Sequence, residues 1–258
     1  MTASTQAGTA TLLFEQPLNE KTRVYLRLEG IFGRAQQLLA ESSMAAHYAA
    51  FGTLFELMDS VDHGDLRGDL HSDLDKQVQQ LRTLSSNPKV DTEKLRRFLE
   101  QLEKLHHWIL HHQGKFAARL RENEFLHAIK HRYALPGGTC AFDLPRLYCF
   151  LQRPAEARRE RLQQWFNELH GVRTSVDVLL RLMRESTAWR SAQFDEGFFQ
   201  LEPVHGQLLR LRMANTQSVF PEVSSGRQRC VIRLAVADDD GAVKYLRESS
   251  GFEYALCG

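Results

Sequence analysis

The apolar residues of this 258-residue chain change their spacing near Phe194, and this change constrains the fold more than any other feature. Across Asn19–Ser186 they recur every three or four residues, which is typical of amphipathic helices. After Phe194 they alternate with polar residues as in half-buried strands, separated by turn formers such as Ser224–Gly226 and Asp238–Gly241. Thr11–Glu15 is a further short strand candidate. The pattern predicts an α+β protein: a multi-helix bundle domain with a small, mostly antiparallel β domain built from the C-terminal third plus the first strand.

The same pattern sets the expected domain boundaries. We expect a disordered leader at residues 1–10, a helical domain at 18–192, and a β domain formed by 11–16 and 193–258. The leader is small and polar and lacks the basic and apolar segments of a signal peptide. The first strand is therefore expected to join the sheet formed by the last third of the chain.

Capping residues mark where several helices are expected to begin and end. Asn19 and Asp91 are placed to accept hydrogen bonds from the first turns of two helices. Asp143 precedes Leu144–Pro145 and is placed to cap another helix with proline in its first turn. His170–Gly171 is predicted to end a helix, because glycine adopts the backbone conformation of a C-cap.

Two long amphipathic helices are predicted to form a hairpin. One covers about Asp65–Leu84, and the other begins near Asp91. Asn87–Pro88 forces a turn between them. Helices joined by so short a loop pack side by side in antiparallel fashion.

Composition restricts the kinds of partner. The chain has 33 basic and 32 acidic side chains and a net charge of +1, so no overall field attracts nucleic acid or an anionic membrane. Its four cysteines have no CxxC or zinc-type spacing, which fits a reducing compartment. No apolar run is long enough to span a bilayer. We expect a cytoplasmic protein whose electrostatic recognition is local.

Two strand candidates concentrate arginines on one side. In the stretch that begins at Arg227, the alternation places Arg229 and Arg233 opposite apolar residues, and Arg210 and Arg212 are placed the same way in an earlier strand. If the two strands share a sheet with their apolar faces inward, the arginines form a cationic outer face suited to carboxylates or phosphates.

The alternative interpretation of these arginines is structural. An arginine on the wet side of a half-buried strand ordinarily serves solubility, and Glu202 or Glu253 on neighbouring strands could pair with it across the sheet. The arginine pattern therefore needs support from elsewhere in the chain.

Histidines and cysteines offer a weaker catalytic hypothesis. His107 with His111, and His127 with His131, have the i, i+4 spacing that allows two imidazoles to bind one metal. Neither pair contains the glutamate of an HExxH motif, and no motif ties a base to Cys140. A histidine-based metalloenzyme stays a third alternative, and we expect no enzyme activity, metal or cofactor.

Two longer motifs resemble a known family. Leu13–Lys21, continuing through Leu26–Glu29, is similar to the opening of the bacterial ZapD cell-division family. Leu135–Gly138 and the following Phe142–Pro145 resemble its central signature, and the arginine strand resembles its counterpart. The likeness runs from about Leu13 to the end of the chain.

The resemblance implies a non-enzymatic, cytosolic homodimer with a helical and a β domain. Such proteins bind the C-terminal tail of the tubulin-like GTPase FtsZ and cross-link its filaments at the mid-cell division ring. The residues agree with this physically, because guanidinium groups bind carboxylates of an extended peptide in bidentate fashion. A symmetric dimer supplies two such sites.

The expected peptide site combines the resemblance with the arginine pattern. Family basic positions correspond to Arg27, Arg67, Arg229 and Arg233, whereas His63, Glu124 and Tyr148 depart from the family pattern, and Arg121 and Arg146 are placed to compensate. The predicted partner-binding residues are Arg229, Arg233, Arg67, Arg27, Arg227, Arg210, Arg212 and His63.

A nucleic-acid-binding module that uses the same arginines is the alternative from another functional class. It needs exposed aromatics interleaved with the cations and a net basic charge, and the sequence has neither. We therefore expect no nucleic-acid partner.

Overall fold

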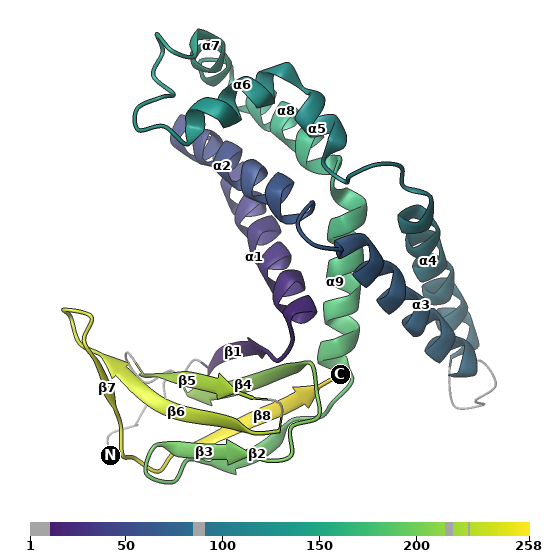
Figure 1. Ribbon diagram of the computed structural model, residues 1–258, viewed down its shortest axis with the longest axis vertical. Helices are drawn as coiled ribbons and strands as arrows, with labels where there is room; N and C mark the ends of the chain where they lie inside the picture. The colour runs from purple at the N-terminus through teal and green to yellow at the C-terminus, as the bar shows by residue number, and fades with distance from the viewer. Residues whose placement is uncertain (1–10, 85–90, 215–218, 227) are drawn as a thin grey trace, which may run out of the picture. The chain divides into compact units, whose positions relative to one another are not determined.

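The computed structural model describes residues 11–84, 91–214, 219–226 and 228–258 (Figure 1). The predicted leader at 1–10, the Asn87–Pro88 turn and Arg227 lie outside the described residues. The chain divides into two compact units. One, here called the helical unit, is Val24–Leu180, and the other, the β unit, is Arg181–Gly258 together with the described residues up to Arg23.

The fold class is α+β, as predicted. The helices are α1 (Glu20–Ala40), α2 (Met44–Ser60), α3 (Leu66–Leu84), α4 (Thr92–His111), α5 (Ala118–Glu122), α6 (Glu124–Tyr133), α7 (Pro145–Leu151), α8 (Ala155–Asn167) and α9 (His170–Glu185). The first turn of α1 and the last turn of α9 belong to the β unit.

Side-chain caps begin several of these helices. The Oδ1 atom of Asn19 accepts from the backbone N–H of Thr22 at 2.8 Å, and Asp91 caps α4 through Lys94 N at 3.1 Å. Each cap satisfies a backbone donor that has no partner within the helix. Both capping predictions are confirmed.

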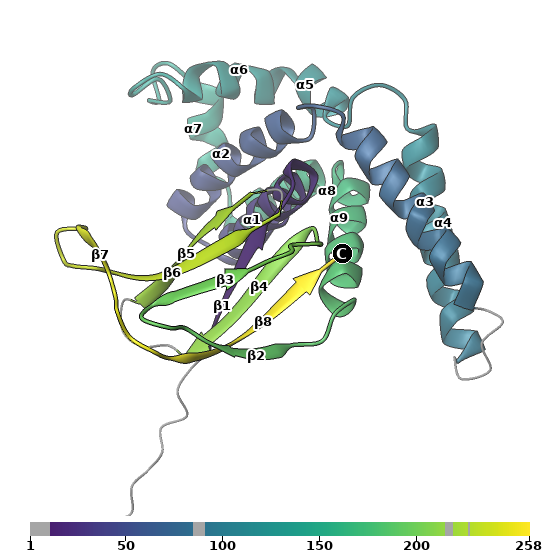
Figure 2. The ribbon, with the colours of Figure 1, turned by 60° about the horizontal axis from the view of Figure 1, so that its bottom comes forward.

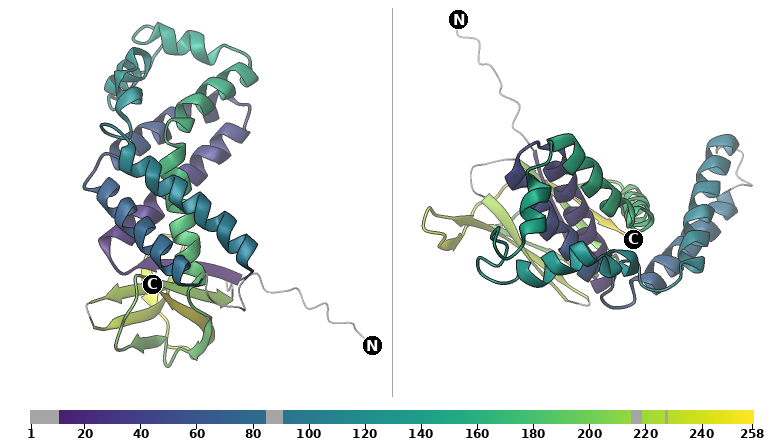
Figure 3. Two further views of the ribbon diagram at one scale, coloured as in Figure 1. Left: turned by 90° about the vertical axis from the view of Figure 1, so that its right-hand side faces the viewer. Right: turned by 90° about the horizontal axis from the view of Figure 1, so that it is seen from above.

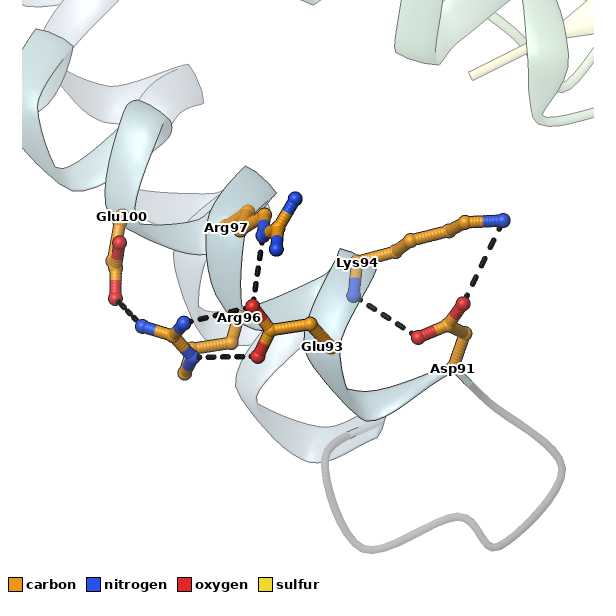
Figure 4. Close-up of polar contacts among 6 residues, drawn as sticks. All are labelled: Asp91, Glu93, Lys94, Arg96, Arg97 and Glu100. Atoms are coloured by element: carbon orange, nitrogen blue, oxygen red, sulfur yellow. Dashed lines mark hydrogen bonds and ion pairs between the residues drawn. The ribbon is translucent and has the colours of Figure 1, made fainter.

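The predicted helical hairpin is formed by α3 and α4, which run side by side in opposite directions (Figures 1 and 3). Leu70 and Leu74 of α3 and Leu102 and Ile109 of α4 are fully buried. The first turns of α4 carry two exposed groups of paired charges, one between Asp91 and Lys94 and one around Glu93 and Arg96 (Figure 4). Together the two groups comprise Asp91, Glu93, Lys94, Arg96, Arg97 and Glu100, with three charges of each sign. These charges cancel, and their i, i+3 and i, i+4 pairs stabilise the start of α4.

Two helix boundaries differ from the prediction. Leu144 occupies the N-cap of α7 without a side-chain bond, and Asp143 lies one residue earlier, 3.5 Å from Arg132. His170–Gly171 begins α9 and does not end a helix. A Cβ atom on Gly171 would lie 2.6 Å from the Trp108 ring, so the glycine allows close packing and has no capping role.

In its described residues, the β unit consists of two four-stranded antiparallel sheets (Figure 2). The first has the order β1-β4-β8-β2, and in the second β6 pairs with β3, β5 and β7. The strands are β1 (Thr11–Pro17), β2 (Arg190–Gln193), β3 (Phe198–Leu201), β4 (Leu208–Ala214), β5 (Val219–Ser225), β6 (Cys230–Ala237), β7 (Val243–Tyr245) and β8 (Gly251–Cys257). The pairing of β1 with β4 confirms that the first strand joins a sheet of the C-terminal third.

Three strands were not predicted. β2 has no apolar alternation, and β7 is only three residues long. β5 contains Pro221, which argues against a central strand, but β5 lies at the edge of its sheet, where a missing N–H is tolerated.

Candidate functional site

The arginines of β4 and β6 lie on opposite outer faces of the β unit. Leu209 and Leu211 of β4 and Ile232 and Leu234 of β6 belong to one buried cluster. Since side chains alternate along a strand, the arginines of each strand point away from this shared core. β4 and β6 are in different sheets. The single arginine face expected from a shared sheet is therefore corrected to two separate faces.

The β6 face presents Arg229 and Arg233 to solvent. Neither arginine forms an ion pair with a carboxylate of the described residues. The Arg233 guanidinium lies 5.5 Å from the ring centroid of Tyr245, which orients it across the sheet. Arg233 also lines a pocket of about 380 Å³ with Glu222, Val223, Ser224, Val231 and Tyr245.

Glu222 is the one acidic residue of this pocket. The Tyr245 hydroxyl donates to Glu222 Oε2 at 2.8 Å. This hydrogen bond and the charge of the carboxylate raise the pKa of Tyr245 above its ordinary value. Arg233 also contacts this pair, because its charge and its side-chain hydrogen bond to Tyr245 lower the same pKa. It forms no ion pair with a carboxylate of the described residues, so the rest of its donor edge can bind an incoming acidic group.

On the β4 face, carboxylates of the same unit already bind the arginines. Glu15 lies 2.9 Å from Arg210 Nε and 2.5 Å from Arg184 Nη2. Arg212 pairs with Glu253 at 3.1 Å, as the structural interpretation of the strand arginines anticipated. Both strand arginines also stack on Trp189, with guanidinium carbons 4.8 and 4.1 Å from the ring centroid. These ion pairs and ring contacts hold the arginines of β4 within the β unit, so their role there is structural.

Three predicted residues belong to the helical unit. Arg67 is half-buried, donates to the carbonyl of Gly114, and lies 5.5 Å from the Phe116 ring centroid. Its contacts therefore attach the loop after α4 to α3. Arg27 is exposed on α1, and His63 is exposed at the corner between α2 and α3.

The two residues placed to compensate have different surroundings. Arg121 pairs with Asp62 at 2.8 Å and with Asp59 at 3.3 Å, so it is engaged within the helical unit. Arg146 is exposed and lies 5.5 Å from the Phe125 ring centroid.

Arg146 belongs to a pocket of about 770 Å³ that sequence reasoning did not assemble. Arg153 and Arg161 also line it, and Phe125, Phe150 and Trp165 form its apolar part. Trp165 fits the apolar spacing of a helix in the sequence, and only the fold shows that arginines surround it. We call it the arginine–aromatic pocket; Asn123, Glu124, Pro145 and Cys149 complete its lining.

The histidine pairs show no assembled metal site. The His107 and His111 rings lie 3.9 Å apart, and His111 Nδ1 contacts the His107 carbonyl at 2.9 Å. Across the described ranges, no group of three or more histidine, cysteine or acidic residues is placed to hold a metal. All four cysteines are free, with Cys140 exposed. No helix in the described part of the chain is long and apolar enough to cross a membrane.

Comparison with known proteins extends over both units. A family model described as the cell division protein ZapD matches residues 26–233. The ZapD of Chromobacterium violaceum is 38% identical over 228 residues, which cover 87% of this chain and 90% of that protein. The ZapD of Pectobacterium atrosepticum is 33% identical over 252 residues, covering 97% and 99%. That of a Janthinobacterium species is 32% identical over 248 residues, covering 95% and 99%.

These matches confirm the resemblance found in the opening and central motifs, and they support a role in cell division. Because they extend over most of the chain and most of each relative, the likeness is not limited to a shared motif. The chain therefore belongs to the ZapD family of cell division proteins.

Proposed function

We propose that the protein is a non-enzymatic adaptor that binds the C-terminal tail of FtsZ and cross-links FtsZ filaments at the cytoplasmic division ring. The observation that carries this proposal is the β6 face, where Arg229 and Arg233 are exposed and have no carboxylate partner among the described residues. Membership in a cell-division family supports the biological setting.

A tail that carries carboxylates suits this face. Guanidinium groups bind carboxylates through two parallel hydrogen bonds, and the ring of Tyr245 holds Arg233 in one orientation before a ligand arrives. We assign the direct contacts to Arg229 and Arg233, and Arg227, which lies outside the described residues, stays a proposed partner-binding residue on its sequence position alone. Arg27, Arg67 and His63 of the helical unit stay proposed partner-binding residues of that unit. Arg210 and Arg212 support it indirectly, through the structure of the β unit.

Filament cross-linking needs more than one tail site in each particle. A symmetric homodimer provides two, and simultaneous binding raises the apparent affinity without any new contact. Exposed charge contacts are screened over roughly 8 Å at physiological ionic strength, so tail binding should weaken as salt is raised.

Sedimentation of FtsZ filaments tests the proposal. Wild-type protein should bring filaments into the low-speed pellet, and Arg229→Glu/Arg233→Glu should lose this activity. Arg190→Glu/Arg247→Glu is a matched control, because it makes the same charge change at two exposed arginines of the β unit. FtsZ without its tail should also fail to pellet. Equal pelleting by the Arg229/Arg233 variant and the wild type would show that the β6 face is not the site.

The nucleic-acid alternative predicts a different result from the same variants. Fluorescence anisotropy with a labelled single-stranded oligonucleotide should show no binding that depends on Arg229 and Arg233. A tight, salt-sensitive complex that the double variant abolishes would favour phosphates over carboxylates as the ligand of this face.

A further inference from the structure

The arginine–aromatic pocket of the helical unit has the features of a second binding site. Arg146, Arg153 and Arg161 come from α7, the link after it, and α8, and all three are exposed. None of them forms an ion pair with a carboxylate in the described part of the chain. Glu124 is the one acidic residue of the lining, so the pocket carries a net positive charge.

Aromatic rings hold the three guanidinium groups in place. Their central carbons lie 5.5 Å from the Phe125 centroid for Arg146, 5.7 Å from Phe150 for Arg153, and 4.9 Å from Trp165 for Arg161. Stacking uses the flat face of a guanidinium and leaves its N–H edges able to donate to an anion. One edge of Arg161 donates to Gln164 at 2.9 Å.

The apolar part of the pocket is packed and built on buried groups. Phe125 stacks on Trp165 with centroids 5.8 Å apart, and only 6% of Trp165 is exposed. The backbone next to the pocket is also held, because the buried Arg158 donates to the carbonyl of Arg153. The site is therefore formed before a ligand arrives, which lowers the entropic cost of binding.

This combination favours an acidic peptide over other anions. Inorganic phosphate has no apolar part to contact the rings, and a long nucleic acid gains little from a chain of net charge +1. Ligand pockets are ordinarily of about 300–1,000 Å³, a volume that holds a few residues of an extended peptide. A segment with carboxylates on both sides of an aliphatic or aromatic side chain matches the cations and the rings together.

We propose that each chain carries two docking sites for acidic peptides, the β6 face and the arginine–aromatic pocket of the helical unit. This inference rests on the proposed function for the β6 face and adds to it a second site in the other unit. One consequence is that a single chain can link two tails, so cross-linking does not depend on dimer formation alone.

Calorimetric titration of the full-length protein tests the stoichiometry. The probe is a synthetic acidic peptide with one leucine between carboxylates, and its leucine-to-serine counterpart is the matched probe. Wild-type protein should bind two peptides per chain, and Arg153→Glu/Arg161→Glu should bind one. Arg119→Glu, also an exposed helical-unit position, should still bind two. The serine probe should bind the pocket at least about tenfold more weakly, because it loses a buried leucine.

The outcomes separate this inference from the function on which it rests. If Arg229→Glu/Arg233→Glu still binds two peptides per chain, the β6 face is not a peptide site. The pocket is tested separately, by Arg153→Glu/Arg161→Glu. If Arg153→Glu/Arg161→Glu binds as many peptides as the wild type, the pocket proposal is wrong. Binding of only one peptide or none by the wild type also overturns it. So does displacement of the pocket-bound peptide by GTP or inorganic phosphate at the concentration at which unlabelled peptide displaces it. Far-ultraviolet circular dichroism and a second variant, Arg153→Gln/Arg161→Gln, guard against misfolding: a folded glutamine variant that still binds two peptides contradicts the proposal.

Discussion

Arg158 and His47 are hydrogen bonded to each other in the interior of the helical unit, where Arg158 Nε donates to His47 Nδ1 at 2.9 Å. The remaining bonds of the guanidinium go to carbonyls of Leu151, Arg153 and Ser42. No carboxylate of the described residues pairs with it. One buried cation therefore joins the start of α2 to the link between α7 and α8.

Replacing Arg158 should destabilise the protein strongly. Arg158→Met removes the donors of four hydrogen bonds and leaves their acceptors buried, which should cost about 3 kcal/mol in free energy of unfolding. Arg158→Lys should recover only part of this loss, since an ammonium group lacks the planar fork. Urea unfolding measures both. A methionine variant within about 0.5 kcal/mol of the wild type would show that the bonds contribute little.

The contact between Arg158 and His47 also predicts that the free energy of unfolding depends on pH. Burial, followed by the charge of Arg158, lowers the pKa of His47 below its ordinary value of 6.5. The unfolded chain therefore binds a proton at a higher pH than the folded one. The histidine's contribution is fully present above about pH 6.5 and is lost progressively as pH falls toward the lowered pKa of the folded state.

His47→Gln isolates this contribution, because glutamine can accept from Arg158 but does not titrate. Unfolding free energies of both proteins should be measured from pH 7.5 down to 5. The difference between them should change in favour of the glutamine variant as the pH decreases. A difference that stays constant with pH would mean that His47 is not the group responsible.

Glu15 should contribute strongly to the free energy of unfolding. It is the shared partner of Arg184 and Arg210, and all three side chains are mostly buried. Glu15→Gln leaves two guanidinium groups without their anion and should cost about 3 kcal/mol. Glu253→Gln is the matched control, because its pair with Arg212 is more than 40% exposed on both sides and should contribute less than about 1 kcal/mol. Similar losses in the two variants would contradict this ranking.

Local signals in the sequence were sufficient for most of the helical unit. Asn19 and Asp91 cap helices because their short side chains place an oxygen where it accepts a hydrogen bond from a backbone N–H of the first turn. Gly171 shows where such signals fail. A glycine can end a helix or admit a neighbouring ring, and the neighbour here, Trp108, is distant in sequence.

The candidate site depended more on long-range pairing. Alternation correctly predicted which side of β4 and β6 is apolar, but alternation says nothing about which strands share a sheet. The partner of Arg210 could not be predicted from the sequence either, because Glu15 lies almost two hundred positions away in the chain. The arginine–aromatic pocket was not predicted, because its residues come from α6, α7, the link after it and α8, and only the fold brings them together.

Gly171 gives the last prediction. An alanine Cβ at this position would lie 2.6 Å from three atoms of the Trp108 ring, closer than real contacts allow, and a rigid indole must shift to relieve it. Gly171→Ala should therefore destabilise the protein by about 1–3 kcal/mol, although alanine is the better helix former. Gly30→Ala in α1 is the control, because nothing lies within 4 Å of its added Cβ, and it should stabilise by up to about 1 kcal/mol. Thermal unfolding of the two variants should give shifts of opposite sign, and an increase for Gly171→Ala would show that the α4–α9 contact tolerates the methyl group.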